Sequence, residues 1–144
     1  MHHLNILDRL HARLLDIIGT ALPLITSSIA DADLIGLAHL RTEMIQAIDA
    51  YTHYVHDHVL DAAVAANDPA RMQLAHEIKI GCISLEQTYR TFTSRWAHRD
   101  GMLNWPEYRL SAIVMMKQIR DQVRSASRWE PLDDRATGVA NLPG

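Results

Sequence analysis

The stretch from Pro69 to His98, PARMQLAHEIKIGCISLEQTYRTFTSRWAH, organises the rest of the sequence. Its apolar residues recur at alternating steps of three and four positions. They are Ala75, Ile78, Cys82, Leu85, Tyr89, Phe92 and Trp96. An α-helix turns once in 3.6 residues, so this spacing places all of them on one face of a helix. A long helix of this kind must pack its apolar face against other helices, and we expect the rest of the chain to supply them.

Three further segments show the same helical spacing of apolar residues. The first, His3 to Thr20, carries Leu4, Leu7, His11, Leu14 and Ile18 on one face. The second, Leu34 to Ala66, carries Leu37, Leu40, Met44, Ile48, Tyr51, Val55, Val59 and Ala62. The last begins after Asn104 and carries Tyr108, Leu110, Ile113, Met116, Ile119 and Val123 before it fades near Ser125.

Capping and breaking residues divide these segments. Pro23 is expected to end or kink the first helix, because proline lacks a backbone N–H and clashes with the preceding turn. Residues 22–29 then form either a kinked continuation or a second short helix. Asp33 is a predicted N-cap, and Asp68 before a proline is a strong helix start. Glu107 is expected to close a capping box onto Asn104.

Four amphipathic helices with short connections and no alternating strand pattern predict an all-α protein. The expected architecture is an up-down-up-down antiparallel four-helix bundle formed by residues 1–130. Residues 131–144 contain few apolar side chains to bury, so we expect a flexible C-terminal tail.

The composition excludes several classes of protein. The formal net charge of −3 lacks the basic excess typical of nucleic-acid binding, and no apolar run reaches the ~20 residues of a membrane span. With one cysteine, Cys82, an internal disulfide is impossible, which fits a reducing compartment. Since no signal peptide is visible, we expect a cytoplasmic protein. A homodimer is expected if part of an apolar face stays uncovered.

Nine histidines are many for a chain of this length, and several fall where metal ligands would be useful. His53 and Asp57 are four residues apart and share a helix face, with His56 beside them. Together with His11 on the first helix they reach the three or four ligands of a site for zinc or another divalent ion. The alternative interpretation is a core histidine at His11 and a solvated or hydrogen-bonded cluster around His53.

The stretch from Glu77 to Trp96 also resembles a known family. Its pattern is similar to the third-helix signature of the hemerythrin-like, or HHE cation-binding, domains of bacteria. The matching residues are Glu77, Gly81, Leu85, Tyr89, Phe92, Arg95 and Trp96. The segment from Arg124 to Asp133 resembles the closing segment of that family. The resemblance extends from about Leu7 to Asp133 and implies a four-helix bundle that holds two iron ions with His and carboxylate side chains.

Only some of the implied iron ligands have a counterpart in this sequence. His11 matches the histidine of the first helix, and His53 with Asp57 matches the His-x-x-x-Glu pair of the second, with Asp in place of Glu. A shift of one residue would instead place His56 at the carboxylate position.

In the third helix the matching places pair His76 with Ile80 and Glu77 with Gly81, so neither forms a ligand pair. In the fourth helix they read Ser125 and Ala126. We therefore expect a non-enzymatic binding or regulatory module that has lost the di-iron centre. It would carry no cofactor, or at most one iron or zinc ion at the reduced site.

A second hypothesis comes from His76-Glu-Ile-Lys-Ile-Gly81. This run resembles the His-x-x-Lys-Gly motif of histidine phosphotransfer proteins with one residue inserted, which would make His76 a phosphoacceptor. The insertion rotates Gly81 by about a hundred degrees from the expected face. No order of Ser, His and Asp and no glycine-rich phosphate loop indicates any other enzyme.

Overall fold

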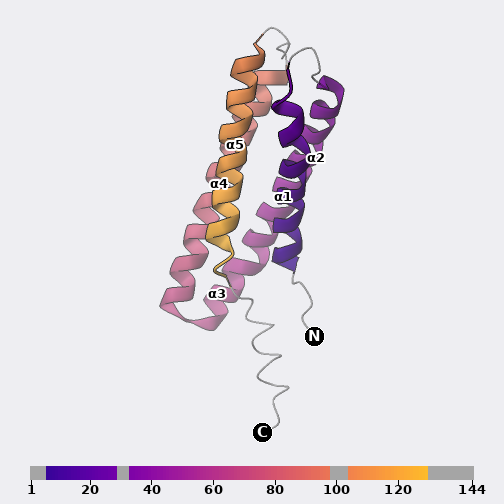
Figure 1. The fold of residues 1–144 in the computed structure, drawn as a ribbon. Coiled ribbons are helices and arrows are strands. Elements are labelled where there is room, and N and C mark those ends of the chain that lie inside the picture. Colours follow the sequence, from indigo (N-terminus) through magenta and orange to yellow (C-terminus); the bar gives the residue numbers. More distant parts are fainter. Residues whose placement is uncertain (1–5, 29–32, 98–103, 130–144) are drawn as a thin grey trace.

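The computed structural model describes residues 6–28, 33–97 and 104–129, and this part of the chain is helical without strands. Four long helical runs lie side by side, and successive runs point in opposite directions (Figure 1). They are α1 (Ile6–Ile25), α2 (Leu34–Tyr54) continued by η2 (Val55–Val59) and α3 (Leu60–Ala66), α4 (Pro69–Ala97), and α5 (Trp105–Ala126). The predicted four-helix architecture is consistent with this arrangement, whereas the predicted tail lies outside the described residues.

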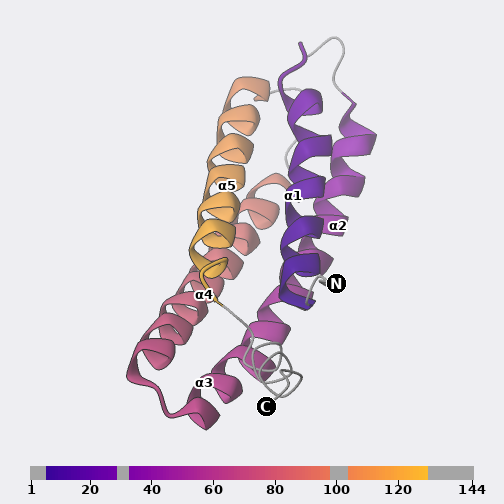
Figure 2. The same cartoon turned by 60° about the horizontal axis from the view of Figure 1, so that its bottom comes forward.

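Each long helix packs against two neighbours. α1 contacts α2 and α5, and α4 contacts α5 and α2, so the four surround a common core. The hairpin of α3 and the beginning of α4 extends past the ends of α1 and α5 (Figure 2). Trp129, just beyond α5, is buried there, and the Arg71 guanidinium lies 4.1 Å from the centre of its ring. The chain after α5 therefore covers part of the beginning of α4.

The core is built mainly from the predicted apolar faces. All seven predicted positions of α4 are buried, as are Leu7, His11, Leu14 and Ile18 of α1. The prediction for α5 was partly wrong, because Leu110 and Ile113 are 64% and 40% exposed. Their places in the core are taken by Ala112 and Met115. A helix with apolar residues on two faces allows more than one stripe at steps of three and four, and packing selects between them.

α1 continues through Pro23 to Ile25, which agrees with the predicted continuation of the first helix and not with a second short helix. Proline deprives the Gly19 carbonyl of its helical donor. Gly19 and Pro23 are both exposed, which leaves that carbonyl near water, while Ala21 and Ile25 are buried and hold the last turn against the core. Burial of the apolar face therefore outweighs the cost of proline.

All three predicted helix starts were confirmed, whereas the predicted capping box at Asn104 was wrong. The Asp33 carboxylate accepts a hydrogen bond from the Gly36 N–H at 2.8 Å, and the Asp68 carboxylate accepts one from the Ala70 N–H at 3.1 Å. Asn104 is the N-cap of α5 but makes no side-chain capping bond. Glu107 instead forms an ion pair with Arg95 of α4. A capping box did not form because a cation of the neighbouring helix engages the carboxylate.

Candidate functional site

Two features in the core are candidates for function: a layer of polar side chains and an apolar cavity. The polar layer consists of one residue from each long helix, namely His11 (α1), Tyr51 (α2), Cys82 (α4) and Gln122 (α5), all buried. Gln122 lies at its centre. Its Nε2 donates to the Tyr51 hydroxyl at 3.0 Å and to the Ile78 carbonyl at 3.1 Å, and lies 3.6 Å from the Cys82 sulfur.

Gly81 makes room for this amide. A Cβ atom at Gly81 would collide with Oε1 of Gln122 and would lie 2.7 Å from its side-chain carbonyl carbon. Because Gly81 has no side chain, the Gln122 amide can lie against the backbone of α4 and reach the Ile78 carbonyl. This contact explains why position 81 is a glycine, so the close approach of a partner protein is not needed to explain it.

Burial keeps the polar layer uncharged. It raises the pKa of the Tyr51 hydroxyl and raises the pKa of the Cys82 thiol to about 12. It lowers the pKa of His11, against the opposing charge of Asp8. The ring centres of His11 and Tyr51 lie 5.2 Å apart, and Nε2 of His11 has no hydrogen-bond partner among the residues that the structure describes. The layer thus combines a neutral imidazole, a phenol, a thiol and an amide.

This chemistry does not fit a di-iron centre. Iron ligands of the hemerythrin type are carboxylates and imidazoles, whereas the four groups of the polar layer include no carboxylate. Across residues 6–28, 33–97 and 104–129, no group of three or more His, Cys, Asp or Glu side chains is placed to hold a metal ion.

The four predicted metal ligands lie in different environments. His11 is buried in the core, whereas His53, His56 and Asp57 are exposed on the surface. Nδ1 of His53 lies 2.9 Å from the Asp49 carbonyl, and this bond, followed by the charge of Asp49, raises the pKa of His53. The structure therefore does not bring His11 together with the histidines of the second helical run.

A π-helical turn, η2, follows α2 directly after His53 and Tyr54. The Leu60 N–H bonds to the Val55 carbonyl, five residues back, and both Val55 and Val59 remain buried. The turn carries His56, whose Nδ1 accepts a hydrogen bond from Lys79 of α4 at 2.9 Å. Nδ1 of His56 is thus engaged by the ammonium group of Lys79. Apolar periodicity gave no sign of the extra residue in this turn.

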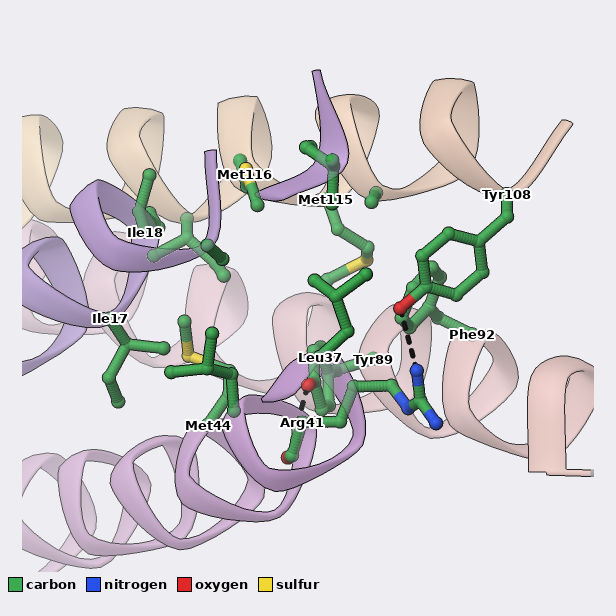
Figure 3. A pocket seen from close by; sticks show the side chains of 15 residues that line it. Ile17, Ile18, Leu37, Arg41, Met44, Tyr89, Phe92, Tyr108, Met115 and Met116 are labelled. Atoms are coloured by element: carbon green, nitrogen blue, oxygen red, sulfur yellow. Dashed lines mark hydrogen bonds between the residues drawn. The ribbon is translucent and has the colours of Figure 1, made fainter. Parts of the chain in front are cut away.

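The apolar cavity lies between the four long helices. It is closer than the polar layer is to the end of the bundle where α1 ends and α2 begins. Its volume is about 50 Å³. Its walls are apolar and aromatic, including three methionines, and two tyrosines and one arginine also contribute (Figure 3). The lining residues are Ile17, Ile18, Ala21, Ile25, Leu37, Leu40, Arg41, Met44, Tyr89, Phe92, Tyr108, Ala112, Met115, Met116 and Ile119.

Arg41 connects three helices beside this cavity. Its guanidinium donates to the Tyr108 hydroxyl of α5 at 2.7 Å, and its backbone carbonyl accepts from the Tyr89 hydroxyl of α4 at 3.2 Å (Figure 3). The polar atoms nearest the cavity therefore bond to one another. A water molecule inside would find few of the two to four partners that it needs.

Sequence reasoning missed Gln122 and the cavity. Gln122 could have been found from its position, because it lies on the core face of α5 together with Ile119, Val123 and Ala126. A polar residue at such a position is a signal of a buried polar contact. The cavity left no such signal, since its lining residues have the same spacing as any packed core.

Comparisons with models of protein families, with curated proteins and with solved structures found no match to this chain. Among the described residues, no helix combines the length and apolar character needed to cross a membrane. His76, the residue of the phosphotransfer hypothesis, is exposed on α4. The Gly81 of that motif faces Gln122 inside the bundle.

Proposed function

We propose that the chain is a hemerythrin-like four-helix bundle that has lost the di-iron centre and acts as a non-enzymatic binding or regulatory module. The observation that supports this is the polar layer. At the level where side chains from all four helices meet, Gln122 joins Tyr51, Ile78 and Cys82 by neutral hydrogen-bonding contacts. In such a layer the polar groups of the interior form hydrogen bonds with one another and do not coordinate an ion.

The chemistry of the neighbouring residues supports the same proposal. Catalysis commonly uses a titratable group whose pKa lies near the working pH. In the polar layer, burial moves the pKa of Cys82 and of Tyr51 away from neutrality. His11 is the remaining titratable group there, and burial favours its neutral form. A role in binding requires none of these groups to transfer a proton.

The test is metal analysis of protein that carries no affinity tag, combined with an ultraviolet-visible spectrum. Samples should be prepared after growth with added iron and again with added zinc. The proposal predicts metal far below one ion per chain and no absorption bands of an oxo-bridged iron pair. A His11→Phe variant is the matched control, because it removes the one imidazole that is buried within residues 6–28, 33–97 and 104–129. Near-stoichiometric iron that His11→Phe abolishes would overturn the proposal.

A further inference from the structure

We propose that the apolar cavity is a binding site for a small, uncharged, apolar molecule, in the size range of a xenon atom. This inference deepens the proposed binding function, because it names the site and the class of ligand. Three properties of the cavity support it: size, dryness and accessibility.

The size of the cavity limits what it can hold. Its volume of about 50 Å³ is about a third of the ~150 Å³ of an engineered apolar cavity that binds benzene or xenon. A ligand in the present conformation can therefore have only a few heavy atoms. Met44, Met115 and Met116 form part of the wall, and the flexible, polarisable methionine side chain adapts to the shape of an apolar guest.

The polarity of the cavity selects an uncharged ligand. The hydroxyls of Tyr89 and Tyr108 are engaged with Arg41, which leaves the interior with apolar walls. An anion or a strongly polar molecule would lose its hydration without gaining hydrogen bonds. An apolar molecule loses nothing of this kind and gains dispersion contacts with atoms that now face empty space.

Access is available on one side. Of the lining residues, only Leu40 and Arg41 are partly exposed, and the others are buried. Both belong to α2, so the shortest way in passes this face of α2. The Arg41 side chain crosses here to Tyr108, so it lies across this way in.

Xenon dissolved under pressure is a suitable probe, with the methionine methyl groups as reporters in NMR spectra. The methyl resonances of Met44, Met115 and Met116 should shift in a saturable manner. Met72 is 37% exposed and away from the cavity, so its resonance should not shift. The absence of a saturable shift, or an equal shift at Met72, would overturn the inference.

Two variants fill the cavity and one serves as a control. Ala112→Leu places added carbon atoms in the cavity and should abolish the saturable shift, whereas Val114→Leu enlarges an exposed residue of the same helix and should leave it intact. Should Ala112→Leu fail to fold, Ala21→Val fills the same space from α1. Retention of the saturable shift in a folded cavity-filling variant would contradict the site.

A final comparison tests the class of ligand. Butyrate should produce no saturable shift, because its carboxylate has no partner in the cavity. Tighter binding of butyrate than of xenon, lost in Arg41→Met, would overturn the assignment of an uncharged ligand. The result is independent of the iron analysis, since bound iron would contradict the proposed function while an empty cavity would contradict only this inference.

Discussion

Gly81→Ala is the substitution that most sharply tests how α4 and α5 fit together. Alanine is usually favoured over glycine inside a helix, by about 0.5–1 kcal/mol. Here the added methyl group would collide with the buried amide of Gln122. The helix preference and the packing therefore predict opposite signs for the change in stability.

The size of the loss follows from the bonds that Gln122 must give up. Moving the amide away from Gly81 weakens its hydrogen bonds to Tyr51 and to the Ile78 carbonyl. Each bond contributes about 1 kcal/mol, and a buried donor left unpaired costs about 1–3 kcal/mol. After subtracting the helix preference of alanine, we expect Gly81→Ala to lower the free energy of unfolding by about 1–2 kcal/mol.

Urea denaturation followed by circular dichroism measures this change, and a double-mutant cycle identifies its cause. In the Gln122→Ala background the obstacle is gone, so Gly81→Ala should become neutral or stabilising by up to about 1 kcal/mol. The reasoning is refuted if Gly81→Ala stabilises the otherwise unchanged protein, or if the loss is the same in both backgrounds.

Three further predictions concern single groups. Burial lowers the pKa of His11 from 6.5 against the charge of Asp8, so the unfolded chain binds more protons below that pH. Stability should therefore fall on acidification through about pH 6.5, and His11→Phe should weaken this dependence in urea titrations between about pH 7.5 and 5.5. Cys82 is buried and its pKa is raised to about 12, so iodoacetamide should modify it only after denaturation, and rapid labelling of native protein would contradict its placement. Tyr108→Phe removes the acceptor of the Arg41 guanidinium and should cost about 1 kcal/mol in thermal or urea unfolding, whereas an unchanged midpoint would show that the bond contributes nothing.

Much of the fold could be predicted because burial follows helical periodicity. The apolar face of α4, from Ala75 to Trp96, was recovered completely, because its seven residues form one continuous stripe, while Ile80 and Ile83 lie exposed outside it. α5 was harder, because Leu110, Ile113 and Val114 offer a second apolar stripe that the structure leaves exposed. Periodicity ranks faces by apolar content, whereas packing also depends on which side chains fit the neighbouring helices.

The candidate site could be predicted only in part. His11, Tyr51 and Cys82 were predicted on the apolar faces of their helices, and the structure buries all three. The contacts of Tyr51 and Cys82 with Gln122 depend on the position of α5 along the axis of α4. No local sequence pattern determines that position. The loss of the di-iron centre and the metal site of His11, His53, His56 and Asp57 remain predictions. His11 is buried, whereas His53 is exposed.

The most direct test of the polar layer is a crystal structure of the protein grown with excess ferrous or zinc ions, with anomalous scattering measured at the metal edge. We predict no anomalous peak among His11, Tyr51, Cys82 and Gln122, with the Gln122 amide bonded to the Tyr51 hydroxyl. A strong peak bound by Nε2 of His11, with the Gln122 amide displaced, would contradict the account.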